Sequence, residues 1–113
     1  MSKQKQKGTD GENAVVEALT RAGFTVERRA LSGINDKGDI AGLKDVVIEV
    51  KKHDSYAGKL AGWVDEADTE RRNAKATIGV VWHRRKGKGK AEEWFVTMSG
   101  DQFLYLLRRI NAQ

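Results

Sequence analysis

The sequence predicts an α/β fold with a mixed central β-sheet flanked by helices. Apolar residues recur at helical spacing near the start, in the middle and at the end of the chain, and short apolar or alternating runs typical of strands lie between them. The resulting order is helix, three strands, helix, two strands, helix, which is the pattern of a layered α/β domain. The 113 residues suffice for one such domain.

The elements follow from local signals. We expect residues 1–8, rich in lysine and glutamine, to be a flexible basic tail, and residues 9–113 to form the domain. The first helix begins at Thr9 and ends at Gly23, a C-cap residue. A strand at 24–30 and a turn-rich loop at 31–38 come next, followed by strands at 39–43 and 46–52 that are joined by a tight turn. The second half has a helix at 58–74, a strand at 76–82, a basic loop at 84–90 and a strand at 94–97. Ser99 caps a final helix, with Gln102 in the capping-box position.

Composition narrows the functional classes. The chain has no cysteine, which excludes disulfides, zinc-thiolate sites and thiol catalysis. Because it has only two histidines, a bound metal would be held mainly by carboxylate oxygen, which favours Mg²⁺ or Mn²⁺. The net charge of +5 suits a polyanionic partner such as nucleic acid. No apolar run is long enough to span a bilayer, and the basic N-terminus is no secretory signal, so we expect a cytoplasmic protein without a membrane partner.

The strand at 46–52 carries the strongest functional signal. Side chains alternate between the two faces of a strand, so Ile48 and Val50 alternate with Glu49 and Lys51. A strand this apolar is expected inside the sheet. Burying an acid and a base there is unfavourable unless they are paired or bind a metal. The alternative interpretation is an exposed Glu–Lys ion pair of little energetic weight.

Asp39 begins the preceding strand, and the hairpin returns the chain alongside it. This arrangement is expected to bring Asp39 close to Glu49. Two converging carboxylates form a hard-oxygen site for a divalent cation, and a neighbouring ammonium such as Lys51 can orient a water molecule or offset charge on a phosphate. Asp after Gly at a strand start is also ordinary turn chemistry, which is the alternative for Asp39.

This ordered set resembles the core of the PD-(D/E)XK nuclease superfamily, whose signature is an acid at one strand start followed by acid-x-lysine on the next strand. The resemblance covers the chain from about Thr9 to Trp82, and the order of its helices and strands also fits. Gly38 stands where the signature usually has proline, a change that affects the loop and no ligand. The resemblance implies a restriction-endonuclease-like core and Mg²⁺-dependent hydrolysis of DNA, with Mn²⁺ as a substitute.

Within the superfamily, the chain resembles the small Holliday-junction resolvases of archaea and phages, which are compact and basic and begin with a lysine-rich tail. This resemblance implies that Asp39 and Glu49 bind the metal and that Lys51 activates water. It further implies that Glu12 completes the metal shell and that Ser32 contacts the scissile phosphate or its neighbour. A phage-encoded resolvase would act in the host cytoplasm.

Two of these residues have structural alternatives. Glu12 lies three residues after Thr9 and can instead complete a capping box at the start of the first helix. Ser32 lies in a glycine-containing loop, where serine is common.

Basic residues are expected to bind the DNA backbone, with solvated surface positions as the alternative. No aromatic residues alternate with them, which favours recognition of backbone and shape, as a branched duplex requires, over base stacking. The DNA-binding candidates are Lys3, Lys5, Lys7, Arg28, Arg29, Lys52, Arg84, Arg85, Lys86 and Lys88.

The sequence therefore leads to one main hypothesis and several alternatives. The main one is a magnesium-dependent endodeoxyribonuclease of DNA recombination and repair that cuts a four-way junction as a homodimer, because a two-fold dimer presents two sites to a two-fold junction. The alternatives are a nicking, repair or restriction-type nuclease of the same superfamily, a non-catalytic basic DNA-binding module, and a protein-interaction adaptor.

Overall fold

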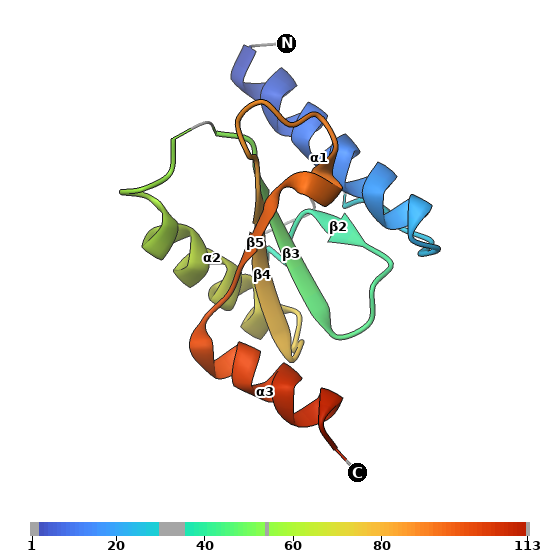
Figure 1. The fold of residues 1–113 in the computed structure, drawn as a ribbon, viewed down its shortest axis with the longest axis vertical. Helices are drawn as coiled ribbons and strands as arrows, with labels where there is room; N and C mark the ends of the chain where they lie inside the picture. The colour runs from blue at the N-terminus through green and yellow to red at the C-terminus, as the bar shows by residue number, and fades with distance from the viewer. Residues whose placement is uncertain (1–2, 30–35, 54, 113) are drawn as a thin grey trace.

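The computed structural model describes residues 3–29, 36–53 and 55–112, and shows three α-helices and two small sheets (Figure 1). Ser32 lies outside the described residues. The elements in chain order are α1 (Lys3–Arg21), β1 (Glu27–Arg28), β2 (Ile40–Ala41), β3 (Val46–Lys51), α2 (Leu60–Asn73), β4 (Ile78–His83), the 3₁₀ turn η1 (Ala91–Glu93), β5 (Phe95–Thr97) and α3 (Gly100–Ile110).

A mixed sheet of three strands forms the centre of the molecule. β3 runs parallel to β4, with Val46 opposite Ile78 and Lys51 opposite His83. β5 lies antiparallel on the other side of β4. The nearly continuous apolar sequence of β4 predicted a strand buried on both faces, and β4 is indeed the middle strand. The parallel β3–β4 pair requires a crossover, which α2 supplies.

The two faces of β3 meet different helices. Ile48 and Val50 belong to the apolar core that also contains Val15 and Leu19 of α1. Glu49 and its neighbours on the opposite face turn toward α2, so α1 and α2 cover opposite sides of the sheet (Figure 1). The predicted alternation of β3 is therefore confirmed, and it separates an apolar face from a face that carries charge. The expectation that this strand lies inside the sheet is wrong, because β3 is an edge strand that is buried by the elements packed on its two faces.

Close packing fixes α2 against the sheet at Gly79. A Cβ built on Gly79 would lie 2.6 Å from the carbonyl oxygen of Ala67 and 3.0 Å from the Cβ of Arg71. Only glycine at this point of β4 allows the helix backbone to approach so closely. This contact sets the depth at which side chains of α2 reach the charged face of β3.

β2 departs from the predicted hairpin. It pairs with β1 rather than forming a ladder with β3. The chain still returns alongside β3, because the Asp39 amide donates a hydrogen bond to the Ile48 carbonyl at 2.9 Å. Asp45, with φ of 68°, makes the turn, and its carboxylate accepts hydrogen bonds from the Thr77 amide and hydroxyl. The prediction that Asp39 returns to β3 is therefore confirmed, although the ladder is not.

The N-terminal elements differ from the predicted boundaries. α1 begins at Lys3 rather than at Thr9, so Thr9 lies inside the helix and cannot be its N-cap. The predicted capping box of Thr9 and Glu12 is therefore wrong. The expected strand at 24–30 is reduced to the two residues of β1, which pair with the two residues of β2. Gly23 does follow the helix, with φ of 100°.

The predicted cap of the last helix is confirmed. Ser99 precedes α3 and its hydroxyl accepts a hydrogen bond from the Gln102 amide at 3.4 Å. The Gln102 side chain forms a different contact from the one that the predicted capping box requires. Its oxygen accepts a hydrogen bond from the Gly79 amide at 2.6 Å, which ties α3 to β4.

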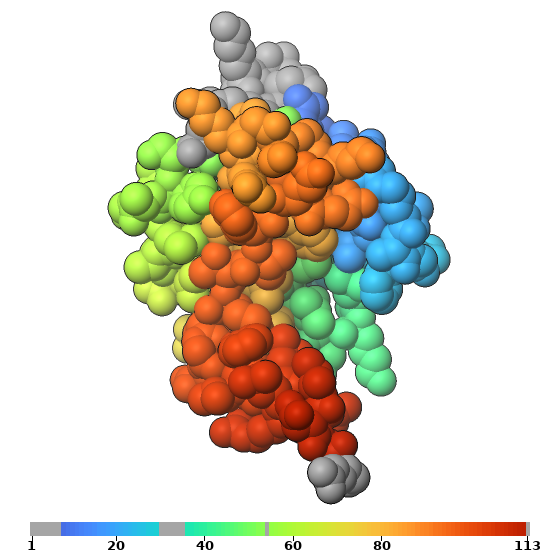
Figure 2. Space-filling model, in the orientation of Figure 1, coloured from blue at the N-terminus to red at the C-terminus, as the bar shows by residue number. Residues whose placement is uncertain are grey.

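α3 projects from one end of the molecule (Figures 1 and 2), and it exposes apolar side chains to solvent. No helix within the described ranges is both long and apolar enough to cross a membrane. The large apolar residues of α3 that solvent reaches are Phe103, Leu104, Leu107 and Ile110.

We expect Gly79→Ala to destabilise the fold by about 1–3 kcal/mol, because the added methyl group overlaps the backbone of α2. The matched control is Gly62→Ala within α2, where a Cβ meets nothing within 4 Å. That change should be neutral or stabilise the helix by up to about 1 kcal/mol. Urea unfolding of both variants measures the difference, and equal stabilities would contradict the close packing at Gly79.

Candidate metal and catalytic site

Asp39 and Glu49 meet at the charged face of β3. Asp39 forms hydrogen bonds with the residues before and after Glu49. Its amide donates to the Ile48 carbonyl at 2.9 Å, and its Oδ2 accepts from the Val50 amide at 2.7 Å. These two bonds hold its carboxyl group close enough to Glu49 for that acid to raise the pKa of Asp39. The structure thus brings together the two acids that the sequence analysis paired.

Two further acids complete the cluster. Glu70 reaches it from α2, and Asp36 reaches it from the segment before β2. One carboxylate oxygen from each of Asp36, Glu49 and Glu70 lies within 4.8 Å of the others. Asp36 is anchored by its carbonyl, which accepts from the Asn73 side chain at 2.9 Å. These three residues could hold a metal ion.

Glu70 is an unusual residue to bury. Only 1% of it is exposed, and neither carboxylate oxygen accepts a hydrogen bond from any residue that the structure describes. A buried carboxylate without a donor is strongly disfavoured unless a proton or a cation neutralises it. Glu70 therefore points to a bound positive charge or proton in the cluster.

Burial and mutual repulsion shift the pKa values of the acids upward. Desolvation, followed by its contact with Glu49, raises the pKa of Asp39 to about 9. Desolvation, followed by its contact with Glu70, raises the pKa of Glu49 to about 9. Desolvation also raises the pKa of Glu70 to about 7. Without a cation, the cluster retains protons near neutral pH that ordinary carboxyls would have released.

Lys51 lies at the edge of the cluster. Its Nζ is 2.8 Å from Glu66 of α2 and 4.0 Å from Glu49. Burial lowers the pKa of Lys51, but the hydrogen bond to Glu66 and the charge of Glu49 outweigh this, so its pKa lies above the ordinary value. The indole ring of Trp63 lies 5.8 Å from the same nitrogen. Lys51 is therefore a charged, half-buried ammonium group held beside the carboxyls.

Glu12 lies on α1 and is not a member of the group formed by Asp36, Glu49 and Glu70. Its carboxylate forms an ion pair with Arg28 of β1 at 3.0 Å. It remains close enough for its charge to raise the pKa of Asp39. A direct or water-mediated role for Glu12 in metal binding stays a prediction.

The predicted DNA-binding residues are spread over several elements. Lys3, Lys5 and Lys7 belong to the first turns of α1, and Arg28 is paired with Glu12. The others follow strands: Arg29 comes after β1, Lys52 after β3, and Arg84, Arg85, Lys86 and Lys88 after β4, where Lys88 lies 3.9 Å from Glu93.

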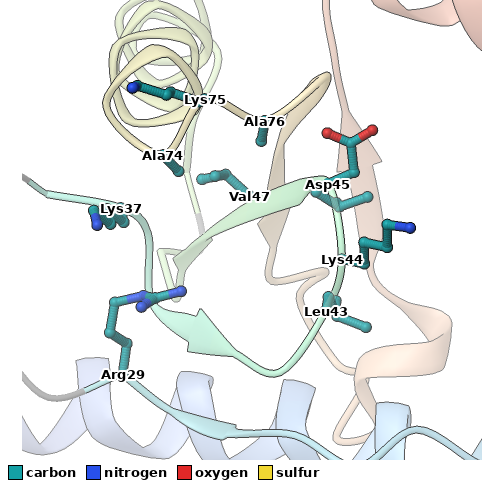
Figure 3. A pocket seen from close by; sticks show the side chains of 10 residues that line it. Arg29, Lys37, Leu43, Lys44, Asp45, Val47, Ala74, Lys75 and Ala76 are labelled. Atoms are coloured by element: carbon teal, nitrogen blue, oxygen red, sulfur yellow. The ribbon is translucent and has the colours of Figure 1, made fainter.

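A pocket with four basic side chains and one acid, Asp45, lies around the start of β3. It is lined by Arg29, Lys37, Lys44 and Lys75, together with Val47, as Figure 3 shows. Val47 and Glu49 are two residues apart in β3 and share one face of the sheet. The pocket and the acidic cluster are therefore connected through one face of β3.

Sequence reasoning did not identify Glu70, Asp36 or Glu66. For Glu70 a signal existed, because it follows the buried Ala67 by three residues and so shares the inward side of α2. An acid on the apolar side of a helix indicates a special role. Asp36 carried no such signal, since aspartate is common in a turn-rich loop.

Comparisons with known proteins add no relative: no family model, no curated protein and no solved structure matches the chain. The chemistry of the site therefore rests on its own geometry. Converging carboxylates can bind a hard divalent cation, and the adjacent ammonium group can bind an anion.

In a chelator, we expect the melting temperature to fall as the pH rises from about 5 to about 9. The folded protein holds protons on Asp39 and Glu49 to a pKa of about 9. The unfolded chain releases these protons near pH 4, so a rise in pH through this window favours unfolding.

Mg²⁺ should reduce that fall, because a bound cation replaces the protons. Glu70→Gln, which cannot ionise, should also flatten the pH dependence in the chelator. Thermal melts at several pH values, followed by circular dichroism, measure both effects. A fall of equal size with and without Mg²⁺ would contradict the interpretation of the cluster as a cation site.

Proposed function

We propose that this protein is a divalent-metal-dependent endonuclease that hydrolyses phosphodiester bonds in DNA. The observation that carries the proposal is the convergence of Asp39 and Glu49 on the charged face of β3, with the ammonium group of Lys51 4.0 Å from Glu49. Acids paired in this way need a cation, and the lysine beside them suits a phosphate substrate.

The residues of the site divide the chemistry between them. Asp39 and Glu49 would hold Mg²⁺, which supplies Lewis-acid activation of the phosphate and of a water molecule. Lys51 remains protonated, so it would orient the attacking water and offset negative charge that develops on the phosphate. Glu66 holds Lys51 in place through the 2.8 Å ion pair. Burial of Glu49 keeps bulk water away from one side of the metal position.

The fold is compatible with the resemblance to the PD-(D/E)XK superfamily. An acid at the start of β2 and the acid-x-lysine run of β3 lie next to each other, and α2 then leads to a parallel neighbour, β4. We infer a restriction-endonuclease-like core from this arrangement. In that interpretation Glu12 assists the metal through water, and Ser32 contacts the phosphate.

DNA is the substrate class that the charges favour. Val47 of the pocket in Figure 3 shares a face of β3 with Glu49, so a strand whose phosphate occupied the pocket could extend toward the metal position. The basic loop after β4 adds further positive charge. Contacts of this kind read the backbone and the shape of the nucleic acid.

We further propose a four-way junction or other branched duplex as substrate and a homodimer as the active form. The substrate rests on the resemblance to the resolvases and on the two-fold symmetry of a junction. The exposed apolar side of α3 supports the dimer, because a monomeric soluble protein rarely presents contiguous apolar side chains to water.

A non-catalytic DNA-binding module is the second candidate, and the 2.8 Å pair of Lys51 with Glu66 favours it, since such a pair can be purely structural. Glu49→Ala separates the two. In a pure binding module this change should leave affinity unchanged or raise it by removing negative charge. In a nuclease it should abolish cleavage while DNA binding remains.

The decisive assay is cleavage of a labelled four-way junction beside matched linear duplex and single strand, with Mg²⁺ and with a chelator. We expect paired, symmetric cuts in the junction that require Mg²⁺. Asp39→Asn should lower the rate roughly 10²-fold or more, because it removes a metal ligand. Asp101→Asn in the first turn of α3 makes the same change of charge far from the site and should leave cleavage unchanged.

Cleavage of all three substrates would support the proposed nuclease activity and exclude junction specificity. Absence of cleavage with either Mg²⁺ or Mn²⁺, in a protein that still binds DNA, would reject the nuclease and favour the binding module.

A further inference from the structure

We propose that Asp36, Glu49 and Glu70 form a second divalent-cation site, which shares Glu49 with the metal position of Asp39. The catalytic meaning of this site rests on the proposed function, but its occupancy by Mg²⁺ or Mn²⁺ can be tested without any cleavage. The three residues come from three separate parts of the chain: the segment before β2, the strand β3 and the helix α2.

The spacing of the three carboxylates suits a small cation. Mg²⁺ binds oxygen at about 2.1 Å. The oxygens of Asp36, Glu49 and Glu70 lie within 4.8 Å of one another, so a common point lies no more than about 2.8 Å from each, and inward shifts of up to about 0.7 Å bring all three to the Mg²⁺–oxygen distance. Oxygen ligands alone select a hard cation over zinc or copper.

The isolation of Glu70 is an independent sign that the cluster takes up positive charge. Both of its carboxylate oxygens are buried within the cluster and lack a hydrogen-bond donor among the described residues. A buried acid that served only to stabilise the fold would be expected to accept hydrogen bonds. Glu70 instead faces Glu49 and Asp36, which are also acids. A cation between them would satisfy all three at once.

Asp36 gives this site access to solvent. It is exposed, whereas Glu49 and Glu70 are buried, so a hydrated cation can enter on the side of Asp36 and retain water molecules there. The Asp36 side chain is oriented by the Gly38 amide, which donates to its Oδ1 at 2.9 Å. The Asn73 side chain, which donates to the Asp36 carbonyl, ties the same residue to the end of α2.

The second site is distinct from that of Asp39. Asp39 contacts Glu49, but it is not one of the three acids whose oxygens lie mutually within 4.8 Å. Its Oδ2 is already used by the Val50 amide. Glu49 contacts both Asp39 and Glu70 and therefore stands between the two positions. Paired metal ions that share a carboxylate can stabilise the attacking and the leaving oxygen of a phosphodiester separately.

The test is the number of Mn²⁺ ions bound per chain in the absence of DNA, measured by electron paramagnetic resonance of free Mn²⁺ and by calorimetry. The wild-type chain is expected to bind two. Glu70→Gln and Asp36→Asn should each leave one ion bound, and Asp39→Asn should also leave one. Glu49→Gln should lose both. Asp65→Asn, an exposed position on α2, makes the same change of charge and should still bind two.

Asp36→Asn alters an exposed side chain, so it tests the site even where Glu70→Gln reduces folding. One bound ion in the wild type, lost in Asp39→Asn but unaffected by Glu70→Gln and Asp36→Asn, would overturn the second site and leave the nuclease intact. If the wild type binds two ions and the variants lose them as expected above, but the protein cleaves no DNA, the second site is supported and the proposed nuclease activity is rejected.

Discussion

Burial of the Glu49 carboxyl in β3, an edge strand of the three-stranded sheet, is the constraint on which the rest of the structure depends. β3 must be apolar enough to lie beside β4, and yet it carries an acid that is 6% exposed. An isolated carboxylate at this depth is unfavourable, so positive charge or protons must accompany it. Lys51 on the same face offers one positive charge, but Asp39 and Glu70 add two more acids. Lys51 alone therefore leaves the cluster short of positive charge.

The position of α2 follows from this constraint. Two residues along a strand span about 6.6 Å, and one helical turn of four residues spans about 6.0 Å. Glu70 therefore meets Glu49 at the same time as Glu66 meets Lys51, in a helix that runs back along the strand. The match works only if the helix lies close, which Gly79 of β4 permits. Gly79 thus permits the close helix position that brings Glu66 and Glu70 to the charged face of β3.

The sequence predicted those features that depend on local periodicity, and it missed those that depend on contacts between distant segments. The alternation of Glu49 with apolar neighbours, the apolar β4 and the Ser99 cap are local, and all three are confirmed. The role of Gln102 depends on its contact with Gly79, which is distant in the sequence. Glu70 belongs to the site only because α2 crosses above β3, and this cannot be read from spacing along the chain.

Gly38 shows how a departure from a motif can follow from the site itself. Its φ of 93° lies far from the value of about −65° that proline requires. Its amide also donates a hydrogen bond to Asp36, and proline has no amide hydrogen to donate. A proline at this position would therefore lose the bond that orients Asp36 toward Glu49 and Glu70. Where the PD-(D/E)XK signature usually has proline before the acid, this chain has the residue that allows a further carboxylate to join the cluster.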